Sequence, residues 1–240
     1  MARERRVVVL PSPLLPASAY APLVAAFGLH GWGAVVASVP LVPAGPEPVS
    51  AAYREAVSGT RLDLVVAHSN AGRYAMAAAG AAPVVYVDAA LPPEHGDATL
   101  APDGLLDHLA GLADGDGLLP EWTRWWGDDD IAAVLPDPAM LAAIRADEQR
   151  MPLTYFRARL GAPDGWTSHP QAYLALGDTY AEETALAGRL GWPTAVLPGA
   201  LHLHHLVDPD AVVTAVLGLA GALGAAAVTS AAGREATTTG

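Results

Sequence analysis

Residues 65–72 read V-V-A-H-S-N-A-G, and this stretch decides how the rest of the chain is interpreted. An apolar segment, L-D-L-V-V, leads into it, and a run of small residues, N-A-G-R-Y-A-M-A-A-A, begins inside it. A sharp strand-to-helix turn that exposes a serine is usually written G-x-S-x-G, whereas here Ala67 and Ala71 stand at the outer glycine positions. Because alanine is also small, the sequence predicts that Ser69 is a nucleophile on such a turn. The alternative is a structural turn in an alanine-rich chain.

The pattern around this stretch alternates between short apolar runs and helix-like segments. Continuous apolar strands separated by helices are typical of a parallel sheet that is covered on both faces. The sequence therefore predicts an α/β protein with a mostly parallel sheet of about six strands and helices on both faces. The six expected strands are 7–10, 34–39, 62–67, 84–87, 172–176 and 194–197. The last helix has a clear start, with Asp208 as N-cap and Pro209 at its first position.

One long segment interrupts the alternation. About 80 residues separate the fourth and fifth strands, and a structureless loop of that length is rare inside a compact domain. We therefore predict a core formed by residues 1–90 and 171–224, with a helical insertion at 91–170. The insertion holds four of the six tryptophans and 14 of the 25 acidic residues, which indicates an apolar inner side and a charged outer side. The alternative is a small satellite core. Residues 225–240 show no amphipathic period, so a disordered tail is expected.

Composition narrows the possible functions. The chain has 240 residues and a formal net charge of −12, which disfavours nucleic acids and anionic membranes as partners. It contains no cysteine, and all 13 basic residues are arginine, so thiol and Schiff-base chemistry are excluded. No carboxylate cluster completes the H-x-H-H run at residues 202–205, so neither a metal nor another cofactor is expected. We expect a cytoplasmic protein that acts on a small molecule, as a monomer or a homodimer.

The N-terminus resembles a signal peptide, with a basic start followed by apolar and small residues. Three prolines interrupt the apolar stretch, and only V-V-V-L runs unbroken. A first β-strand is therefore the preferred interpretation. No apolar run approaches the ~20 residues of a membrane span.

Three chemically active residues follow predicted strands. Ser69 follows the third strand, Asp88 the fourth and His202 the sixth. Reactive groups in such sheets gather at the carboxyl ends of the strands. A serine hydroxyl needs a base to take its proton, and a carboxylate orients an imidazole for that task. We predict a Ser69–His202–Asp88 site, with Asp178 as the alternative acid.

In these features the chain resembles the α/β-hydrolase superfamily. The resemblance covers Val7 to Leu223 and rests on V-V-V-L, V-V-A-H-S-N-A-G, V-Y-V-D-A-A-L-P-P and L-P-G-A-L-H-L-H-H-L-V-D-P-D. It implies that Ser69 is the nucleophile, that His202 is the base, and that the insertion takes the place of the family's lid. The family usually carries its acid after the penultimate strand, where this chain has L-G-D-T-Y-A-E-E. Tyr180 occupies the expected slot and Asp178 comes two residues early, whereas Asp88 matches the place used by some other members.

The resemblance also implies an oxyanion hole, whose donors are the backbone N–H of Asn70 and one from the loop after the first strand. That loop reads P-S-P-L-L at residues 11–15, and proline has no N–H. We expect Leu14 to supply the second donor, although Ser12 and Leu15 are also available. The expected substrate-binding residues are Ser12, Trp122, Trp125, Trp126 and Met151.

The leading functional prediction is a serine hydrolase, similar to an esterase or thioesterase, that acts on a small and largely apolar acyl substrate. The resemblance hints at a role in secondary metabolism. A second hypothesis is a lyase, cyclase or dehydratase on the same fold, with Ser69 and His202 as hydrogen-bond donor and base. A third is a ligand-binding protein without catalysis, because a fold does not fix a function.

Overall fold

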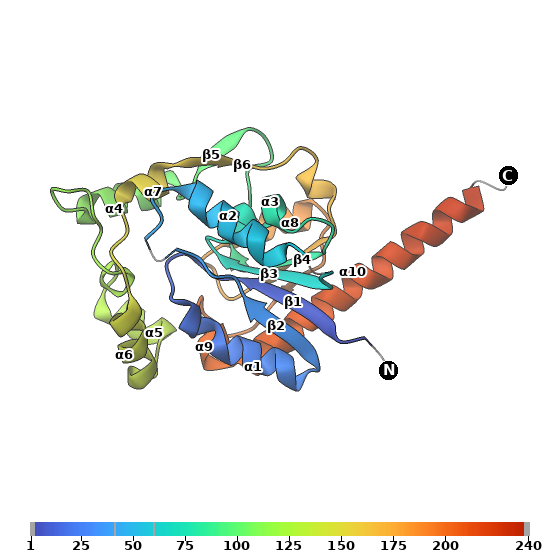
Figure 1. The fold of residues 1–240 in the computed structure, drawn as a ribbon, viewed down its shortest axis with the longest axis horizontal. Helices are drawn as coiled ribbons and strands as arrows, with labels where there is room; N and C mark the ends of the chain where they lie inside the picture. The colour runs from blue at the N-terminus through green and yellow to red at the C-terminus, as the bar shows by residue number, and fades with distance from the viewer. Residues whose placement is uncertain (1–2, 41, 60, 238–240) are drawn as a thin grey trace.

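The centre of the molecule is one parallel sheet of six strands in the order β2-β1-β3-β4-β7-β8 (Figure 1). The computed structural model describes residues 3–40, 42–59 and 61–237, with side chains as far as Ala225. The predicted α/β architecture is confirmed, including the parallel sheet. The strands are β1 (Arg5–Leu10), β2 (Trp32–Val36), β3 (Leu64–Ser69), β4 (Val84–Ala89), β7 (Gln171–Ala175) and β8 (Thr194–Val196).

Successive side chains of the central strands enter two different cores, as the pleat of a strand requires. Val8 and Leu10 of β1 pack into the cluster beneath α2, α3 and α8, whereas Val7 and Val9 pack against α1 and α10. Each fully buried Val or Leu contributes about 1.5–3 kcal/mol relative to its exposed state. The apolar N-terminal run V-V-V-L is therefore an interior strand of the sheet, because both of its faces must be covered.

The helices form two layers around this sheet (Figure 1). One layer contains α1, α9 and α10, and the other contains α2, α3 and α8. Asp208 caps α10, and its carboxylate accepts a hydrogen bond from the N–H of Ala211 at 3.0 Å. The helix bounds are α1 (Ala21–Leu29), α2 (Pro46–Val57), α3 (Gly72–Ala78), α8 (Ala181–Arg189), α9 (His204–Val207) and α10 (Pro209–Thr237). The short 3-10 helix η1 (Ala17–Tyr20) precedes α1.

Helix α10 extends further than the sequence suggests. A disordered tail was expected over residues 225–240, whereas the backbone of α10 continues to Thr237. Alanine has the highest helix propensity, which accounts for a helix in a segment without an amphipathic pattern. Residues 238–240 lie outside the described residues. Within the described part of the chain, no helix combines the length and apolar character needed to cross a membrane.

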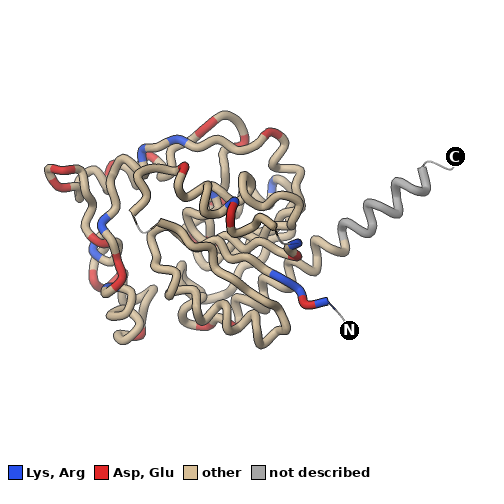
Figure 2. Tube along the Cα trace, in the orientation of Figure 1, with Lys and Arg blue, Asp and Glu red and all other residues tan. Residues whose placement is uncertain are grey.

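Short elements fill the segment between β4 and β7. Strands β5 and β6 pair with each other in antiparallel fashion, and the helices form a separate layer at one end of the molecule (Figure 1). Acidic residues gather along this segment (Figure 2). Trp125 and Trp166 are buried and join the core cluster under α2, α3 and α8. The elements are β5 (Asp97–Thr99), α4 (Asp103–Leu112), η2 (Trp122–Arg124), α5 (Asp128–Val134), α6 (Pro138–Asp147), α7 (Leu153–Arg157), β6 (Arg159–Gly161) and η3 (Trp166–Ser168).

Candidate active site

Ser69 lies at the carboxyl end of β3, on a backbone that L-residues rarely adopt. Its φ is +58°, and the register against β4 shifts between His68 and Ser69. The side chain is buried, and α3 begins three residues later. A non-glycine residue held in the left-handed region costs of order 1–3 kcal/mol and is typical of functional sites. The strand and helix thus form the sharp turn expected at Ser69.

The glycine that this turn requires is Gly72. A Cβ at position 72 would lie 2.1 Å from the carbonyl oxygen of Ala90, so no other residue fits there without a backbone shift. This close approach lets α3 pack directly against the end of β4. The pattern G-x-S-x-G points to positions 67 and 71, whereas the position that admits only glycine is 72.

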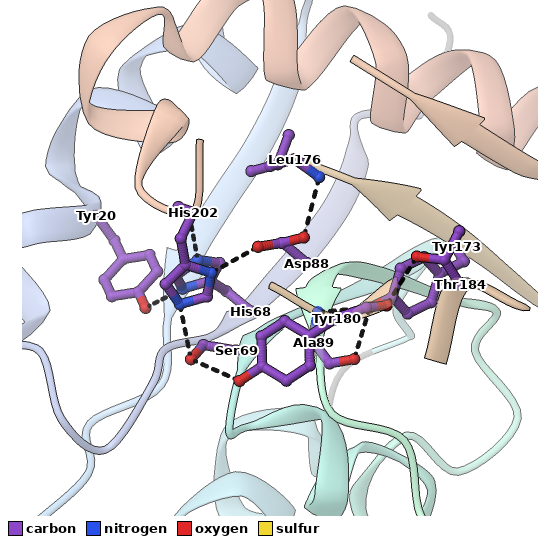
Figure 3. Close-up of polar contacts among 10 residues, drawn as sticks. All are labelled: Tyr20, His68, Ser69, Asp88, Ala89, Tyr173, Leu176, Tyr180, Thr184 and His202. Atoms are coloured by element: carbon purple, nitrogen blue, oxygen red, sulfur yellow. Dashed lines mark hydrogen bonds and ion pairs between the residues drawn. The ribbon is translucent and has the colours of Figure 1, made fainter. Parts of the chain in front are cut away.

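Ser69, His202 and Asp88 meet at this edge of the sheet (Figure 3). His202 Nε2 lies 3.1 Å from Ser69 Oγ, and His202 Nδ1 lies 2.6 Å from Asp88 Oδ2. Because a carboxylate only accepts hydrogen bonds, Nδ1 carries the proton and Nε2 is free to accept from the serine hydroxyl. The arrangement is that of a nucleophile, a base and an acid that orients the base.

The structure distinguishes the two candidate acids. Asp88 is fully buried at the end of β4 with φ +43°, and its second oxygen accepts the N–H of Leu176 at 3.0 Å. Asp178 is exposed after β7 and makes no contact with His202, so the alternative acid does not join the group. The aspartate that contacts the imidazole therefore comes from the strand next to β3.

Tyr180 lies beside Ser69 and His202, a placement that the sequence pattern does not predict. Its hydroxyl lies 3.4 Å from Ser69 Oγ, and its ring centroid is 5.6 Å from that of His202 (Figure 3). Since the serine hydroxyl donates to His202, the Tyr180 hydroxyl donates to Ser69 Oγ. Burial raises the pKa of Tyr180 to about 12, so the phenol keeps its proton at neutral pH. The sequence indicates this role only indirectly, because Tyr180 stands at the position after the penultimate strand where the resemblance places the acid.

The backbone donors of the loop after β1 are already engaged in hydrogen bonds. The N–H of Ser12 donates to the Tyr20 hydroxyl at 2.7 Å. The N–H of Leu14 donates to Ser12 Oγ at 3.3 Å, and that of Leu15 to the Ser12 carbonyl at 3.1 Å. The N–H of Leu14, which the sequence predicts as the second oxyanion donor, is thus engaged within the loop in this structure. Only its side chain lines the cavity at Ser69.

Asn70 remains available for the role expected of it. Its side chain is fixed, because its amide nitrogen donates to the Leu100 carbonyl and its amide oxygen accepts from the Tyr155 hydroxyl, both at 2.9 Å. No acceptor in residues 3–40, 42–59 and 61–237 pairs with the Asn70 N–H. The donors beside Ser69 are therefore this N–H and the Tyr180 hydroxyl.

A cavity of about 580 Å³ opens on Ser69. Its lining includes the apolar residues Leu105, Trp126 and Phe156, together with Arg73 and the acidic residues at the start of α8. Among the expected substrate-binding residues, Trp126 lines this cavity. Trp122 and Met151 line a separate cavity of about 230 Å³. Trp125 is buried against Phe156, and Ser12 is buried within its loop, so neither faces the cavity at Ser69.

Two ionisable side chains of opposite charge, Arg73 and Glu183, line the cavity and are largely removed from water. The Nε of Arg73 is buried without a hydrogen-bond partner in the described part of the chain. Burial lowers the pKa of Arg73 and raises that of Glu183, which faces the same cavity. A guanidinium in this environment is destabilising until a ligand or water supplies an acceptor.

This combination of sheet, serine turn and His–Asp pair is that of the α/β-hydrolase fold, and the chain has that fold. Among solved structures, it is similar to an extracellular α/β-hydrolase from a Paenibacillus species, with 14% identity, a TM-score of 0.70, and coverage of 90% of this chain and 99% of that one. It is also similar to polyneuridine aldehyde esterase, with 12% identity, a TM-score of 0.65, and coverage of 90% and 99%.

A third similar structure is tomato methylketone synthase I, as an H243A variant complexed with β-ketoheptanoate. The identity is 13%, the TM-score is 0.72, and the match covers 93% of this chain and 99% of that one. Neither a family model nor a curated protein sequence matches the chain. At these identities the similarity establishes the fold, and the chemistry must be argued from the site.

Proposed function

We propose that the protein is a serine hydrolase of the esterase or thioesterase type, acting on a small and largely apolar acyl substrate. The observation that carries the proposal is the contact of His202 with both Ser69 and Asp88. A serine hydroxyl so placed is activated as a nucleophile by the adjacent base. Esterases of the same fold, polyneuridine aldehyde esterase among them, add support.

The reaction follows from the positions of the protons. Ser69 Oγ attacks the carbonyl carbon while His202 Nε2 takes the hydroxyl proton, and Asp88 stabilises the imidazolium that forms. The negative oxygen receives the N–H of Asn70. The bond to the leaving group then breaks, and His202 returns the proton to the departing oxygen or sulfur. Water, deprotonated by His202, attacks the acyl-serine and releases the carboxylic acid and the free serine.

The cavity supports an apolar substrate of modest size. Its volume of about 580 Å³ falls within the ~300–1,000 Å³ typical of small-molecule sites. Leu105, Trp126 and Phe156 provide apolar contacts for the acyl chain. The segment between β4 and β7 contributes these side chains and thus takes the place of a lid.

A fluorophosphonate probe and p-nitrophenyl butyrate test the proposal. We expect the wild-type protein to be labelled and to hydrolyse the ester, and Ser69→Ala to lose labelling and at least ~10⁴-fold of the hydrolysis rate. Ser58→Ala, at an exposed serine after α2, is the matched control and should behave as wild type. Labelling that persists in folded Ser69→Ala, or a folded wild-type protein that is neither labelled nor active, would contradict the proposal.

A second candidate function is a lyase, cyclase or dehydratase on the same scaffold. Two observations favour this second function. The N–H groups of Ser12 and Leu14 are already hydrogen-bonded, and the Tyr180 hydroxyl lies beside Ser69. Here His202 removes a proton from carbon next to a carbonyl, and the hydroxyls of Ser69 and Tyr180 donate to the carbonyl oxygen. The electron pair then expels a leaving group or closes a ring.

The two functions differ in their dependence on Ser69. A covalent acyl-enzyme requires its oxygen, whereas in elimination the hydroxyl is only a hydrogen-bond donor. Turnover of a β-hydroxyacyl thioester that survives Ser69→Ala but is lost in His202→Ala would favour the second function. Tight binding of apolar ligands without turnover in any of these assays would favour a binding protein instead.

A further inference from the structure

Three buried aromatic side chains lie behind Ser69 and His202, on the side away from the cavity. Tyr20, His68 and His205 have exposed fractions of 0%, 2% and 1%. His68 precedes Ser69 in β3, and its side chain points toward Tyr20 and the backbone of His202 (Figure 3). None of the three lines the cavity at Ser69, so they do not touch the substrate.

A chain of hydrogen bonds connects Tyr20 and His68 to the site. His205 packs against both rings, and its ring nitrogens make no hydrogen bond within the described part of the chain. The N–H of Ser12 lies 2.7 Å from the Tyr20 hydroxyl, which lies 2.8 Å from His68 Nδ1. His68 Nε2 lies 3.1 Å from the carbonyl oxygen of His202 (Figure 3). Because this carbonyl only accepts, Nε2 of His68 carries the proton. Nδ1 of the neutral ring then accepts from Tyr20, whose oxygen in turn accepts from Ser12. Only a neutral His68 satisfies every member of the chain.

The chain of hydrogen bonds joins two loops and the end of a strand that are far apart in sequence. Ser12 belongs to the loop after β1, His68 to the end of β3, and His202 to the loop between β8 and α9. The His202 ring is held by Asp88 through its Nδ1, and its backbone is held by His68. The rings of His68 and His202 also stack, with centroids 4.9 Å apart and planes at 25°.

We infer that His68 is a positioning residue for His202, fixed as the neutral Nε2–H tautomer by Tyr20 and holding the His202 backbone where the imidazole reaches both Ser69 and Asp88. The catalytic part of this inference rests on the proposed function. The tautomer and the neutral state are properties of the fold and do not depend on it.

The charge environment agrees with a neutral His68. Burial lowers the pKa of His68 well below its usual value, and the two nearby imidazoles of His205 and His202 lower it further. The other titratable group packed on the ring is the Tyr20 phenol, which is uncharged at neutral pH. When His202 takes the proton of Ser69, the ring stacked on it therefore carries no like charge.

Substitutions at His68 separate positioning from packing. Leucine removes both hydrogen bonds, whereas the amide of glutamine keeps one donor and one acceptor. We expect His68→Leu to lower kcat and the rate of fluorophosphonate labelling by about 10²-fold with little change in KM, the size of effect produced by a small misplacement of a reacting group. His68→Gln should recover to within about fivefold of wild type. His95→Leu, at an exposed histidine in the same protein, is the control.

The kinetics of His68→Leu and His68→Gln can contradict the inference in three ways. A His68→Leu protein with wild-type kcat and labelling would overturn the inference. Equal losses in His68→Leu and His68→Gln would also overturn it, because they would indicate that only the ring's packing matters. A loss that appears in KM alone would assign His68 to substrate binding instead.

A spectroscopic measurement on the full chain is independent of catalysis. Nitrogen-15 NMR of the histidine rings should give His68 a protonated Nε2 and an unprotonated Nδ1, unchanged from pH 5.5 to pH 9. Tyr20→Phe should alter the Nδ1 signal, because the phenol that donates to it is lost. A His68 that titrates near neutral pH, or that carries its proton on Nδ1, would overturn the inference. Absence of fluorophosphonate labelling with the expected NMR result would instead count against the proposed hydrolase function.

Discussion

The ends of two neighbouring strands, β3 and β1, contribute unequally to the site. The end of β3 presents Ser69 to His202, which in turn contacts Asp88, so this side is complete for proton transfer. The end of β1 carries the loop at 11–15, whose N–H groups are occupied within the loop or by Tyr20. In the proposed mechanism, activation of the nucleophile and stabilisation of the oxyanion are therefore separate tasks, and the second would depend on donors outside this loop.

The largest effect is expected on the β3 side. Asp88→Asn should lower kcat by about 10⁴-fold, because an amide that donates to Nδ1 favours the wrong tautomer of His202. Asp178→Asn is the matched control, since Asp178 is exposed and does not contact His202. Steady-state kinetics on p-nitrophenyl butyrate would measure both. A stronger loss in Asp178→Asn would show that the acid had been assigned to the wrong strand.

Removal of the Tyr180 hydroxyl tests whether this group acts as a hydrogen-bond donor in place of the engaged N–H groups of the β1 loop. We expect Tyr180→Phe to lower kcat by about 10²-fold, the usual loss for one preorganised donor. The ring is kept, so packing against His202 is preserved. If kcat is unchanged while Asp88→Asn is inactive, the phenol does not act on the reacting atoms.

A buried histidine behind the site, His205, should make stability depend on pH. Burial lowers the pKa of His205 to about 3, so the folded state stays neutral at this residue where the unfolded chain takes a proton. The stabilisation is present above the unfolded pKa of about 6.5 and is lost as the pH falls toward 3. By pH 5 the loss is about 2 kcal/mol for this residue.

His205→Phe provides the comparison, because it keeps a ring against Tyr20 and removes the titrating group. Urea unfolding at pH 8 and pH 5 should give the wild type about 2 kcal/mol more loss of unfolding free energy than the variant. His68 contributes in the same direction to both proteins and cancels. Equal losses in the two proteins would contradict the neutral state of His205.

The smallest effect is expected in the β1 loop itself. Pro13→Ala introduces a backbone N–H next to Ser12, and none of the existing loop bonds requires that group. We expect the rate of ester hydrolysis to stay at the wild-type level, because Pro13 lines the separate cavity of about 230 Å³ and not the cavity at Ser69. Stability should fall by about 0.4–1 kcal/mol, because the unfolded chain becomes more flexible. Pro16→Ala, which precedes η1, controls for the loss of a proline. A gain in rate in Pro13→Ala alone would show that this loop can supply an oxyanion donor.

The parallel sheet and the residues of the serine turn could be predicted because both depend on local patterns. The runs V-V-V-L and L-D-L-V-V-A are apolar at every position, as a strand buried on both faces must be. Chain order placed Ser69, Asp88 and His202 at strand ends. The direction of the N–H groups of Ser12 and Leu14, and the essential glycine at position 72, depend on contacts with Tyr20 and Ala90 that no local pattern reveals.

The positions of the predicted substrate-binding residues diverge for the same reason. Trp122, Trp125 and Trp126 lie close together in sequence, but Trp122 lines a different cavity and Trp125 is buried against Phe156. Of these three tryptophans, Trp126 lines the cavity at Ser69. Composition identifies a tryptophan-rich segment. It does not give the direction of each ring, which is set by how η2 packs on the core.

Two side chains of the site, Ser69 and Asp88, share a left-handed backbone although neither is glycine. Glycine adopts this conformation without a steric penalty, so Ser69→Gly would relieve a local strain of order 1 kcal/mol while removing the hydroxyl of the site. Asp88→Gly would relieve a similar strain but would leave the buried N–H of Leu176 without its acceptor, which costs about 1–3 kcal/mol. A search for thermostable variants that ignores activity would therefore favour glycine at position 69 and keep the aspartate at position 88.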